Sequence, residues 1–210
     1  MKASEAIEKF LVYYDRIYSL SAKGYEDEEI LTFISDASRI AVDTAFRNKA
    51  YNLCPVIDLN TETINVLDNT NVVEVNLSTP IRHIISVYTD VSRTNYPKVE
   101  LTKVEAYPVN LEVLFKIGDK SEISIFNNIL YSYIGNKLYF VGDSFTSILN
   151  VYIKAVRAIP DLVYIPEIQD DTLIISDVLI DSVISYAANL AKAASDNIRI
   201  QPVTTDDTKS

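Results

Sequence analysis

The side chains that most often carry catalysis are few in this chain and stand far apart. His83 is the only histidine, and it lies between Arg82 and Ile84 in a stretch that reads as a strand. One histidine cannot build a histidine-based metal cluster, and no neighbouring cysteine or acid supplies ligand spacing. Cys54 is the single cysteine and sits beside Pro55 with no nucleophile motif around it. We therefore predict no catalytic residue, no metal site and no cofactor.

Loops that bind phosphates or expose a serine nucleophile require glycine at defined positions, and this chain contains little glycine. The chain has 4 glycines, each at a predicted turn: Gly24, Gly118, Gly135 and Gly142. This scarcity argues against nucleotide chemistry. The acidic pairs Asp170-Asp171 and Asp206-Asp207 read as a charged helix start and a solvated end. Distant carboxylates that meet only in the fold stay open as an enzymatic alternative.

The net charge argues against nucleic acids and anionic membranes as binding partners. The chain has 19 Lys and Arg against 29 Asp and Glu, a formal charge of -10, so its average field repels phosphate and anionic lipid. The longest apolar stretch, residues 173–194, is interrupted by Asp177, Asp181 and Asn189. With one cysteine and no apolar leader after Met1, we expect a soluble domain without a membrane partner, which either belongs to a reducing compartment or needs no disulfides.

Helical periodicity marks both ends of the chain. Residues 4–20 place apolar side chains three and four apart, and a second such stripe runs from the acids at 26–29 to about Asn48. We expect these two helices to form an antiparallel hairpin over residues 1–50. A third helix, from Ser176 or Asp177 to about Asp196, is expected to pack with that hairpin.

The middle of the chain has the period of strands. Residues 51–175 form a β-rich region of β-branched and aromatic runs, including strands at 72–77, 81–91 and 148–156. Residues 130–134 and 137–141 flank Gly135-Asn136, which predicts a hairpin with a two-residue turn. The stretch 101–115 is ambiguous. The fold class is therefore α+β, with grouped helices, a central antiparallel β-rich region and an extended tail at 197–210.

Tyrosine is unusually frequent, with 14 residues against no tryptophan. Tyrosine suits wet interfaces because it buries a large ring and keeps a polar tip, although ordinary strand packing is the alternative. In the predicted hairpin neither face is cleanly polar, so one face is expected to meet another subunit. The candidate interface residues in this hairpin are Tyr131, Tyr133, Tyr139 and Phe140.

Three parts of the chain combine turn signals with hydrophobic patterns in a distinctive order. They are an acidic helix start, a hairpin and strand with a proline exit, and a small-residue-rich closing helix. Their sequences are 24–31 (GYEDEEIL) with 34–37 (ISDA); 133–140 (YIGNKLYF) with 151–155 (VYIKA) and Pro160; and 165–166 (IP) with 186–188 (YAA).

This order resembles the head-to-tail connector, or adaptor, proteins of tailed bacteriophages, which form rings beneath the portal of short-tailed phages. The low glycine content and the abundance of Asn, Ile and Tyr are also similar to the ring proteins of crAss-like phages. The resemblance covers most of residues 24–196, while residues 95–121 and the longer exit at Arg157-Ala158-Ile159 depart from the adaptor pattern.

The resemblance implies a structural virion protein at the head–tail junction, not an enzyme. It implies a homo-oligomeric ring of about twelve copies, bound to the portal and to neighbouring tail proteins, with DNA passing through the lumen without specific binding. The acidic charge suits such a lumen, because it repels the DNA backbone.

The resemblance also makes the last residues a candidate arm that orders against a neighbouring subunit or the portal. The candidate contacts of that arm are Ile198, Ile200 and Val203. The alternative function is a tail-associated binding module whose tyrosine-rich β-region recognises a carbohydrate or a protein ligand.

Overall fold

The structure is a computed structural model of the chain, and it describes residues 1–17, 24–61, 65–67, 71–93, 102–118, 128–142 and 146–200. The chain divides into two compact units, and each is described by itself. Unit 1, the helical unit, comprises Met1–Pro55 and Ile159–Ser210, and unit 2, the sheet unit, comprises Val56–Ala158. Residues 159–175, which we expected to belong to the β-rich region, are grouped with the helices instead.

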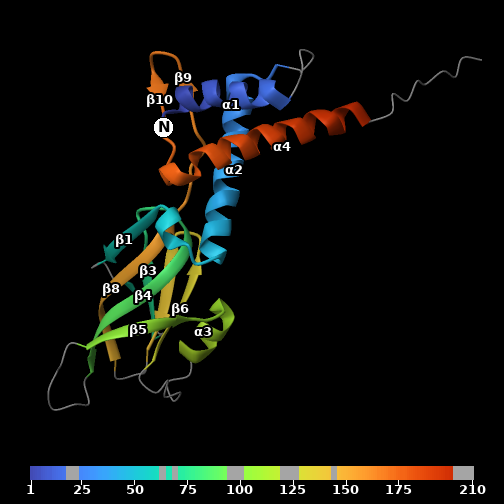
Figure 1. Cartoon of the computed structure of the whole chain (residues 1–210). Helices are drawn as coiled ribbons and strands as arrows, with labels where there is room; N and C mark the ends of the chain where they lie inside the picture. The colour runs from blue at the N-terminus through green and yellow to red at the C-terminus, as the bar shows by residue number, and fades with distance from the viewer. Residues whose placement is uncertain are drawn as a thin grey trace, which may run out of the picture. The chain divides into compact units, whose positions relative to one another are not determined.

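Three long helices carry the helical unit (Figure 1): α1 Ala3–Ile17, α2 Asp27–Arg47 and α4 Ile180–Ile200. Short 3-10 helices, η1 Tyr51–Leu53 and η2 Asp177–Leu179, follow α2 and precede α4. Two short strands, β9 Tyr164–Ile165 and β10 Gln169–Asp170, form a small antiparallel hairpin. A mixed α+β fold with helices at both ends of the chain is confirmed.

The start of α2 is fixed by the acids that the sequence places there. Glu26 and Glu29 form a capping box, in which the Glu26 backbone N–H donates to the Glu29 carboxylate at 3.1 Å. Asp27, Glu28 and Glu29 occupy the first turn, where the helix dipole stabilises negative charge. The predicted helix start is therefore confirmed.

The three long helices share one apolar core. Phe10 from α1, Ile34 from α2 and Ile184 from α4 are all completely buried in it. Figure 1 shows α1 lying across α2 rather than alongside it, so the expected antiparallel hairpin of these two helices is wrong. Both helices pack on α4, because apolar stripes specify burial but leave the crossing angle to the shapes of the packed side chains.

Helix α4 continues beyond the expected end at Asp196 and runs to Ile200. Residues 197–200 are thus helical, and the prediction of an extended arm from residue 197 is wrong for them. The physical reason is that the sequence contains no helix breaker before Pro202, while Ile198 follows Ala194 at helical spacing. Residues 201–210, the rest of the predicted arm, lie outside the described residues.

The sheet unit holds one eight-stranded sheet in the order β1-β8-β4-β5-β6-β7-β3-β2. All neighbouring strands are antiparallel except β5 and β6, which are parallel. The strands are β1 Val56–Thr61, β2 Asn65–Val66, β3 Val72–Asn76, β4 Ile81–Arg93, β5 Thr102–Pro108, β6 Ile129–Ile134, β7 Lys137–Val141 and β8 Thr146–Arg157.

The stretch that was ambiguous in the sequence contains both a strand and a helix. It forms β5 and then α3, Leu111–Gly118. Helix α3 lies in the connection between β5 and β6, and a crossover of this kind is what a parallel strand pair requires. The expected antiparallel β-rich region is therefore antiparallel at every neighbouring pair of the sheet except this one.

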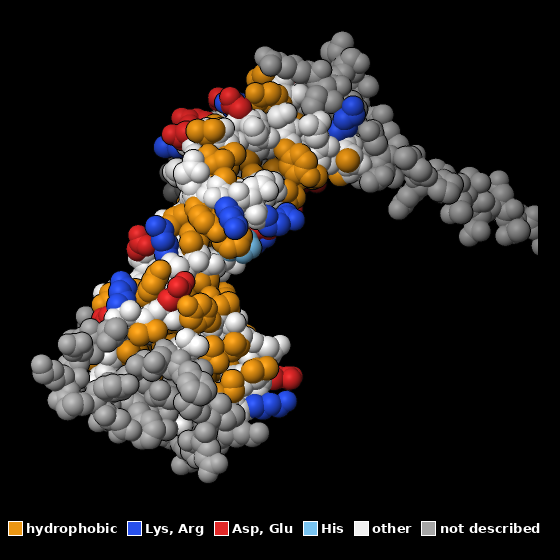
Figure 2. Space-filling view, turned by 60° about the horizontal axis from the view of Figure 1, so that its bottom comes forward, with side chains coloured by type: hydrophobic (Ala, Val, Ile, Leu, Met, Phe, Trp, Pro, Cys, Tyr) orange, Lys and Arg blue, Asp and Glu red, His pale blue; other side chains and the backbone are white. Residues whose placement is uncertain are grey.

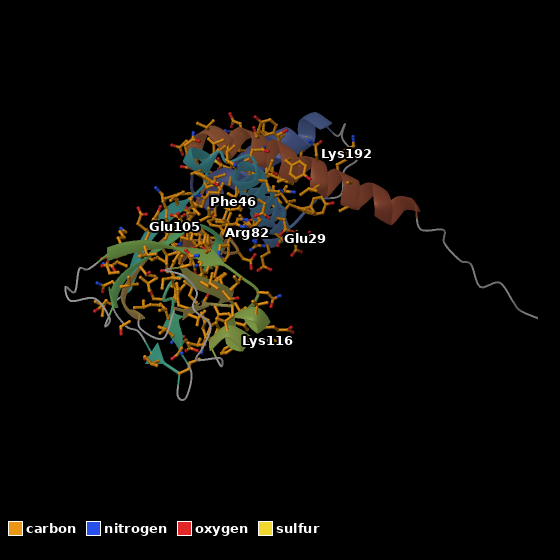
Figure 3. All side chains as sticks on the ribbon, turned by 90° about the horizontal axis from the view of Figure 1, so that it is seen from below. Glu29, Phe46, Arg82, Glu105, Lys116 and Lys192 are labelled. Atoms are coloured by element: carbon orange, nitrogen blue, oxygen red, sulfur yellow. The ribbon has the colours of Figure 1, made fainter. Side chains whose placement is uncertain are left out.

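The sheet is curled, and the chain itself requires the curl. Strands β1 and β2 stand at opposite ends of the sheet, yet only residues 62–64 separate them in the sequence. Since a chain advances at most about 3.6 Å per residue, Thr61 and Asn65 lie within about 14 Å of each other. The enclosed space is filled by side chains (Figure 3), among them Val75, Phe140 and Val151, all completely buried.

The predicted β6–β7 hairpin is confirmed in strands, register and turn. Leu130 faces Val141 across the pair and Ile134 faces Lys137, which leaves Gly135 and Asn136 as the turn. Gly135 has φ +61°, a left-handed conformation that glycine adopts without steric cost.

Among the described residues, no helix combines the length and the apolar character that crossing a membrane would need.

The burial pattern of α1 leads to a test of the helical core. Phe10→Ala should lower the free energy of unfolding by about 3–5 kcal/mol, because it empties a fully buried aromatic site. Val12, which is 51% exposed on the same helix, is the matched control, and Val12→Ala should change stability by no more than about 0.5 kcal/mol. Urea titration followed by circular dichroism measures both, and equal effects of the two changes would contradict the assigned packing.

Candidate functional site

Two of the four hairpin residues predicted to form an interface are core residues. Phe140 is completely buried and Tyr131 is only 7% exposed, and their rings pack at 6.1 Å between centroids. Burial also raises the pKa of the Tyr131 hydroxyl above its usual value. These two rings stabilise the inside of the curled sheet, and they are not on its surface.

The other two hairpin tyrosines are half-buried and make internal contacts. The Tyr133 hydroxyl donates a hydrogen bond to the Ile81 carbonyl at 3.0 Å, which ties β6 to the start of β4. The Tyr139 ring packs against Phe115 of α3 at 5.7 Å. Both tyrosines thus serve the fold of the sheet unit, in line with the strand-packing alternative. Ile134, at the end of β6, is the hairpin residue that stands out at 52% exposure.

The side chains of the three contacts predicted at the C-terminus lie outside the described set. Ile198 and Ile200 lie in the backbone of α4, and their side chains are outside the described set. Val203 lies outside the described residues.

A polar and aromatic cluster covers the outer face of the sheet. Tyr88 on β4 lies directly opposite Tyr152 on β8, and Asp90 lies between Asn150 on β8 and Lys103 on β5. These positions are two residues apart along each strand, so their side chains share one face. Glu105, marked on β5 in Figure 3, pairs with Tyr88 from the other side.

Asp90 organises this cluster through hydrogen bonds. Its Oδ2 accepts one from the Tyr152 hydroxyl at 2.6 Å and one from the Asn150 amide at 3.2 Å. The Tyr152 bond, then the Asn150 bond, lowers the pKa of the Asp90 carboxyl below its usual value, and the positive charge of Lys103 acts in the same direction.

Lys103 connects the acid to the two rings. Its Nζ lies 4.2 Å from the centroid of Tyr152 and 5.4 Å from that of Tyr88, both within cation–π range. A depression of about 290 Å³ opens beside these rings. Its lining combines aromatic rings with charged and amide groups: Asp58, Asn60, Ser86, Tyr88, Lys103, Tyr152 and Lys154, above Leu59 and Ile153. We call this the tyrosine pocket.

An apolar groove lies within the helical unit, between α2 and α4. Its volume is about 420 Å³, which falls within the range of about 300–1,000 Å³ common for binding pockets. Small and apolar side chains dominate the lining: Ala37, Ile40, Ala41, Thr44, Ala45, Asn48, Ala50, Leu53, Leu179, Ser182, Val183 and Tyr186. Two large side chains of the lining, Ile40 on α2 and Tyr186 on α4, are each more than two-fifths exposed. The groove therefore exposes apolar surface from both helices. We call this the helical groove.

Cys54 and Asp170, two of the residues first considered for chemistry, make contacts within the helical unit. The Cys54 thiol lies 3.8 Å from the Val42 carbonyl, and burial, followed by the charge of Asp43, raises its pKa. Asp170 accepts hydrogen bonds from the Ser4 backbone N–H at 3.1 Å and from the Ser4 hydroxyl at 2.9 Å. Within the described part of the chain, no group of three or more His, Cys, Asp or Glu residues is placed to hold a metal ion.

Sequence reasoning missed the tyrosine pocket and the helical groove as sites. Tyr88 and Tyr152 stood out as strand tyrosines, and the alternation of Asn150, Tyr152 and Lys154 in β8 marks a polar face. However, their meeting with Asp90 and Lys103 depends on a pairing of β4, β5 and β8 that the sequence does not specify. The groove left no signal, because its alanines read as ordinary helix interior.

Comparison with protein-family models and with curated proteins finds no match for this chain.

The hydrogen bonds to Asp90 lead to a test by pH titration. Tyr152→Phe removes the first donor and should raise the pKa of Asp90 toward its usual value, because the ionised carboxylate loses its strongest stabilising contact. A folded-state pKa below the unfolded value stabilises the protein above the unfolded pKa, and this contribution disappears as the pH falls through the folded pKa. As the pH falls, the variant should therefore lose the stabilising contribution of the Asp90 carboxylate at a higher pH than the parent protein does.

Carboxyl-carbon NMR measures this titration residue by residue. Glu74 is the internal control, because its carboxylate is held by Lys137 at 3.0 Å, a bond that Tyr152→Phe leaves in place. A shift at Glu74 as large as that at Asp90, or no shift at Asp90, would show that the Tyr152 bond does not control this acid.

Proposed function

We propose that this chain is a non-enzymatic structural protein that assembles into a closed ring at the head–tail junction of a tailed-phage virion. The ring joins the portal to the tail and lines the passage for DNA. The observation that carries the proposal is the helical groove, a concave and largely apolar surface between α2 and α4 of the kind that interfaces between proteins bury.

The surface of the chain supports an assembling role. Figure 2 shows apolar side chains reaching the surface of the helical and sheet units. The exposed apolar residues of the helical unit include Ile168 at 81% and Val178 at 75% exposure. Repeated contact between identical copies produces closed rings when the rotation between them closes, and about twelve copies are expected here. The helical grouping of α1, α2 and α4, with the sheet unit as an insertion, is the arrangement proposed for the ring-forming body.

The charge of the chain supports the proposed passage of DNA. A formal charge of -10 per copy, repeated around a ring, creates a field that repels the phosphate backbone. In this role the acidity of the protein prevents DNA from adhering to the lumen, and no sequence-specific contact is required.

Electron microscopy of the purified chain tests the proposal. Closed rings are expected for the chain alone or together with the portal protein encoded by the same genome. The same preparation should not retain double-stranded DNA at physiological salt. Persistent monomers in the presence of the portal protein would contradict the ring, and tight DNA binding would contradict the proposed lumen.

The tyrosine pocket supports a second candidate function, the binding of a carbohydrate by a tail-associated module. Two rings beside amide, hydroxyl and charged groups offer both stacking surface and hydrogen bonds, which a polyhydroxylated ligand requires. The pocket lies wholly in the sheet unit, so it can act in an assembled ring or in a separate binding protein.

Glycan-array and calorimetric binding separate this candidate from the first. Tyr88→Ala should weaken the binding of an array-selected glycan by about tenfold or more, because it removes one wall of the pocket. Tyr107, 48% exposed on β5 and outside the pocket lining, is the matched control, and Tyr107→Ala should bind as the parent does. Absence of any glycan binding by the parent chain would remove the second candidate.

A further inference from the structure

We propose that the β9–β10 hairpin of one copy docks into the helical groove of the next copy, with Ile168 as its apolar anchor. This inference rests on the proposed ring assembly and names the contact that builds it. The occupant of the groove is therefore a second copy of this chain, and the segment that enters it is the turn at residues 165–168.

The turn is an exposed apolar projection. Ile168 is 81% exposed and Ile165 is 42% exposed, although both are large hydrophobic residues on a short hairpin. The backbone N–H of Ile168 donates to the carbonyl of Ile165 at 3.0 Å, which closes the turn and holds the two side chains near one another. An exposed apolar projection of this kind has the form of an interface anchor.

The turn also holds an acid in a strained backbone conformation. Glu167 has φ +63°, in the left-handed region where glycine is the usual choice after a proline such as Pro166. A non-glycine residue in this region costs free energy, and such positions are common at binding sites. The strained turn places the Glu167 carboxylate beside Ile168, so the projection combines one apolar anchor with one negative charge.

The groove offers the complementary chemistry. Its lining is apolar and small-residue-rich, and it includes Asn48 at the C-terminal end of α2. The exposed residues on either side of Asn48 are the cations Arg47 and Lys49. An incoming Ile168 would fill the apolar groove, and Glu167 would meet these positive charges. The cations beside Asn48 would complement the acid of the hairpin, and this charge complementarity favours the hairpin as the occupant.

The hairpin cannot reach the groove of its own chain. The Ala3 N–H donates to the Asp171 carbonyl at 2.7 Å and the Leu173 N–H donates to the Met1 carbonyl at 3.0 Å, which tie this segment to the start of α1. Lys2 and Ser4 add contacts to Asp170. Figure 1 shows β9 and β10 beside the N-terminal end of α1, away from the C-terminal half of α2. Because projection and groove are different surfaces, their contact is heterologous and propagates from copy to copy.

Single substitutions on each side test the contact in the full-length chain. Ile168→Asp removes the anchor at an exposed site, and Ser182→Glu places a charge in the groove that also repels Glu167. Each should raise the protein concentration needed for ring assembly by about tenfold or more. Val66→Asp, which changes an apolar residue of 68% exposure in the sheet unit, is the matched control and should assemble as the parent does. Circular dichroism verifies that all three variants fold.

Mixing the two defective variants gives the decisive result. The Ile168→Asp copy keeps an intact groove, and the Ser182→Glu copy keeps an intact hairpin, so one working contact forms per pair. Mass photometry should show one-to-one dimers in the mixture, without rings, and monomers for each variant alone. Rings from either single variant at parental concentrations, or no dimers in the mixture, would overturn the proposal.

Two further outcomes separate this contact from the ring itself. If the parent chain forms no ring under any condition, the proposed function and the copy-to-copy contact that rests on it are both wrong. If Ile168→Asp still forms rings but no longer binds the portal protein, the hairpin serves a different partner and the copy-to-copy contact is wrong while the ring stands.

Discussion

The pairing of β1 with β8 joins the two ends of the inserted sheet unit. The chain leaves the helical unit after Pro55 and returns to it at Ile159, and Val56 faces Val156 across this strand pair. The pair therefore holds the exit and the return of the chain together. This closes a loop of about one hundred residues and so reduces the entropic cost of bringing α2 and α4 together in one core.

The aromatic residues fall into two groups, those packed in the core of the helical unit and those lining the tyrosine pocket. In the helical unit, the rings of Phe10, Tyr14, Tyr25 and Phe33 contact one another in succession at 5.3–5.7 Å between centroids. The Tyr25 hydroxyl donates to the Ala191 carbonyl at 2.7 Å and so links this row to α4. These rings stabilise the core, whereas Tyr88 and Tyr152 line the tyrosine pocket beside charged groups, with Lys103 in cation–π range of both rings.

The two proposed roles use different units and different chemistry. The helical unit offers an apolar groove and an apolar projection, which together suit contacts between copies. The sheet unit offers a polar, tyrosine-lined depression, which suits a small hydrophilic ligand. Since each surface is built from residues of a single unit, an assembling body can carry a recognition surface without either one weakening the other.

Local periodicity and residues such as Glu26, Glu29 and Gly135 predicted three long helices, several strands and the β6–β7 turn from the sequence alone. Which side chains lie on the surface depends on tertiary contacts. Phe140 and Tyr131 are buried because the sheet curls, a consequence of pairing between strands distant in sequence. The parallel β5–β6 pair, the crossing of α1 over α2 and the meeting of Asp90 with Tyr152 likewise arise from long-range packing. Hydrophobic patterns specify that a residue is buried, but not which partner buries it.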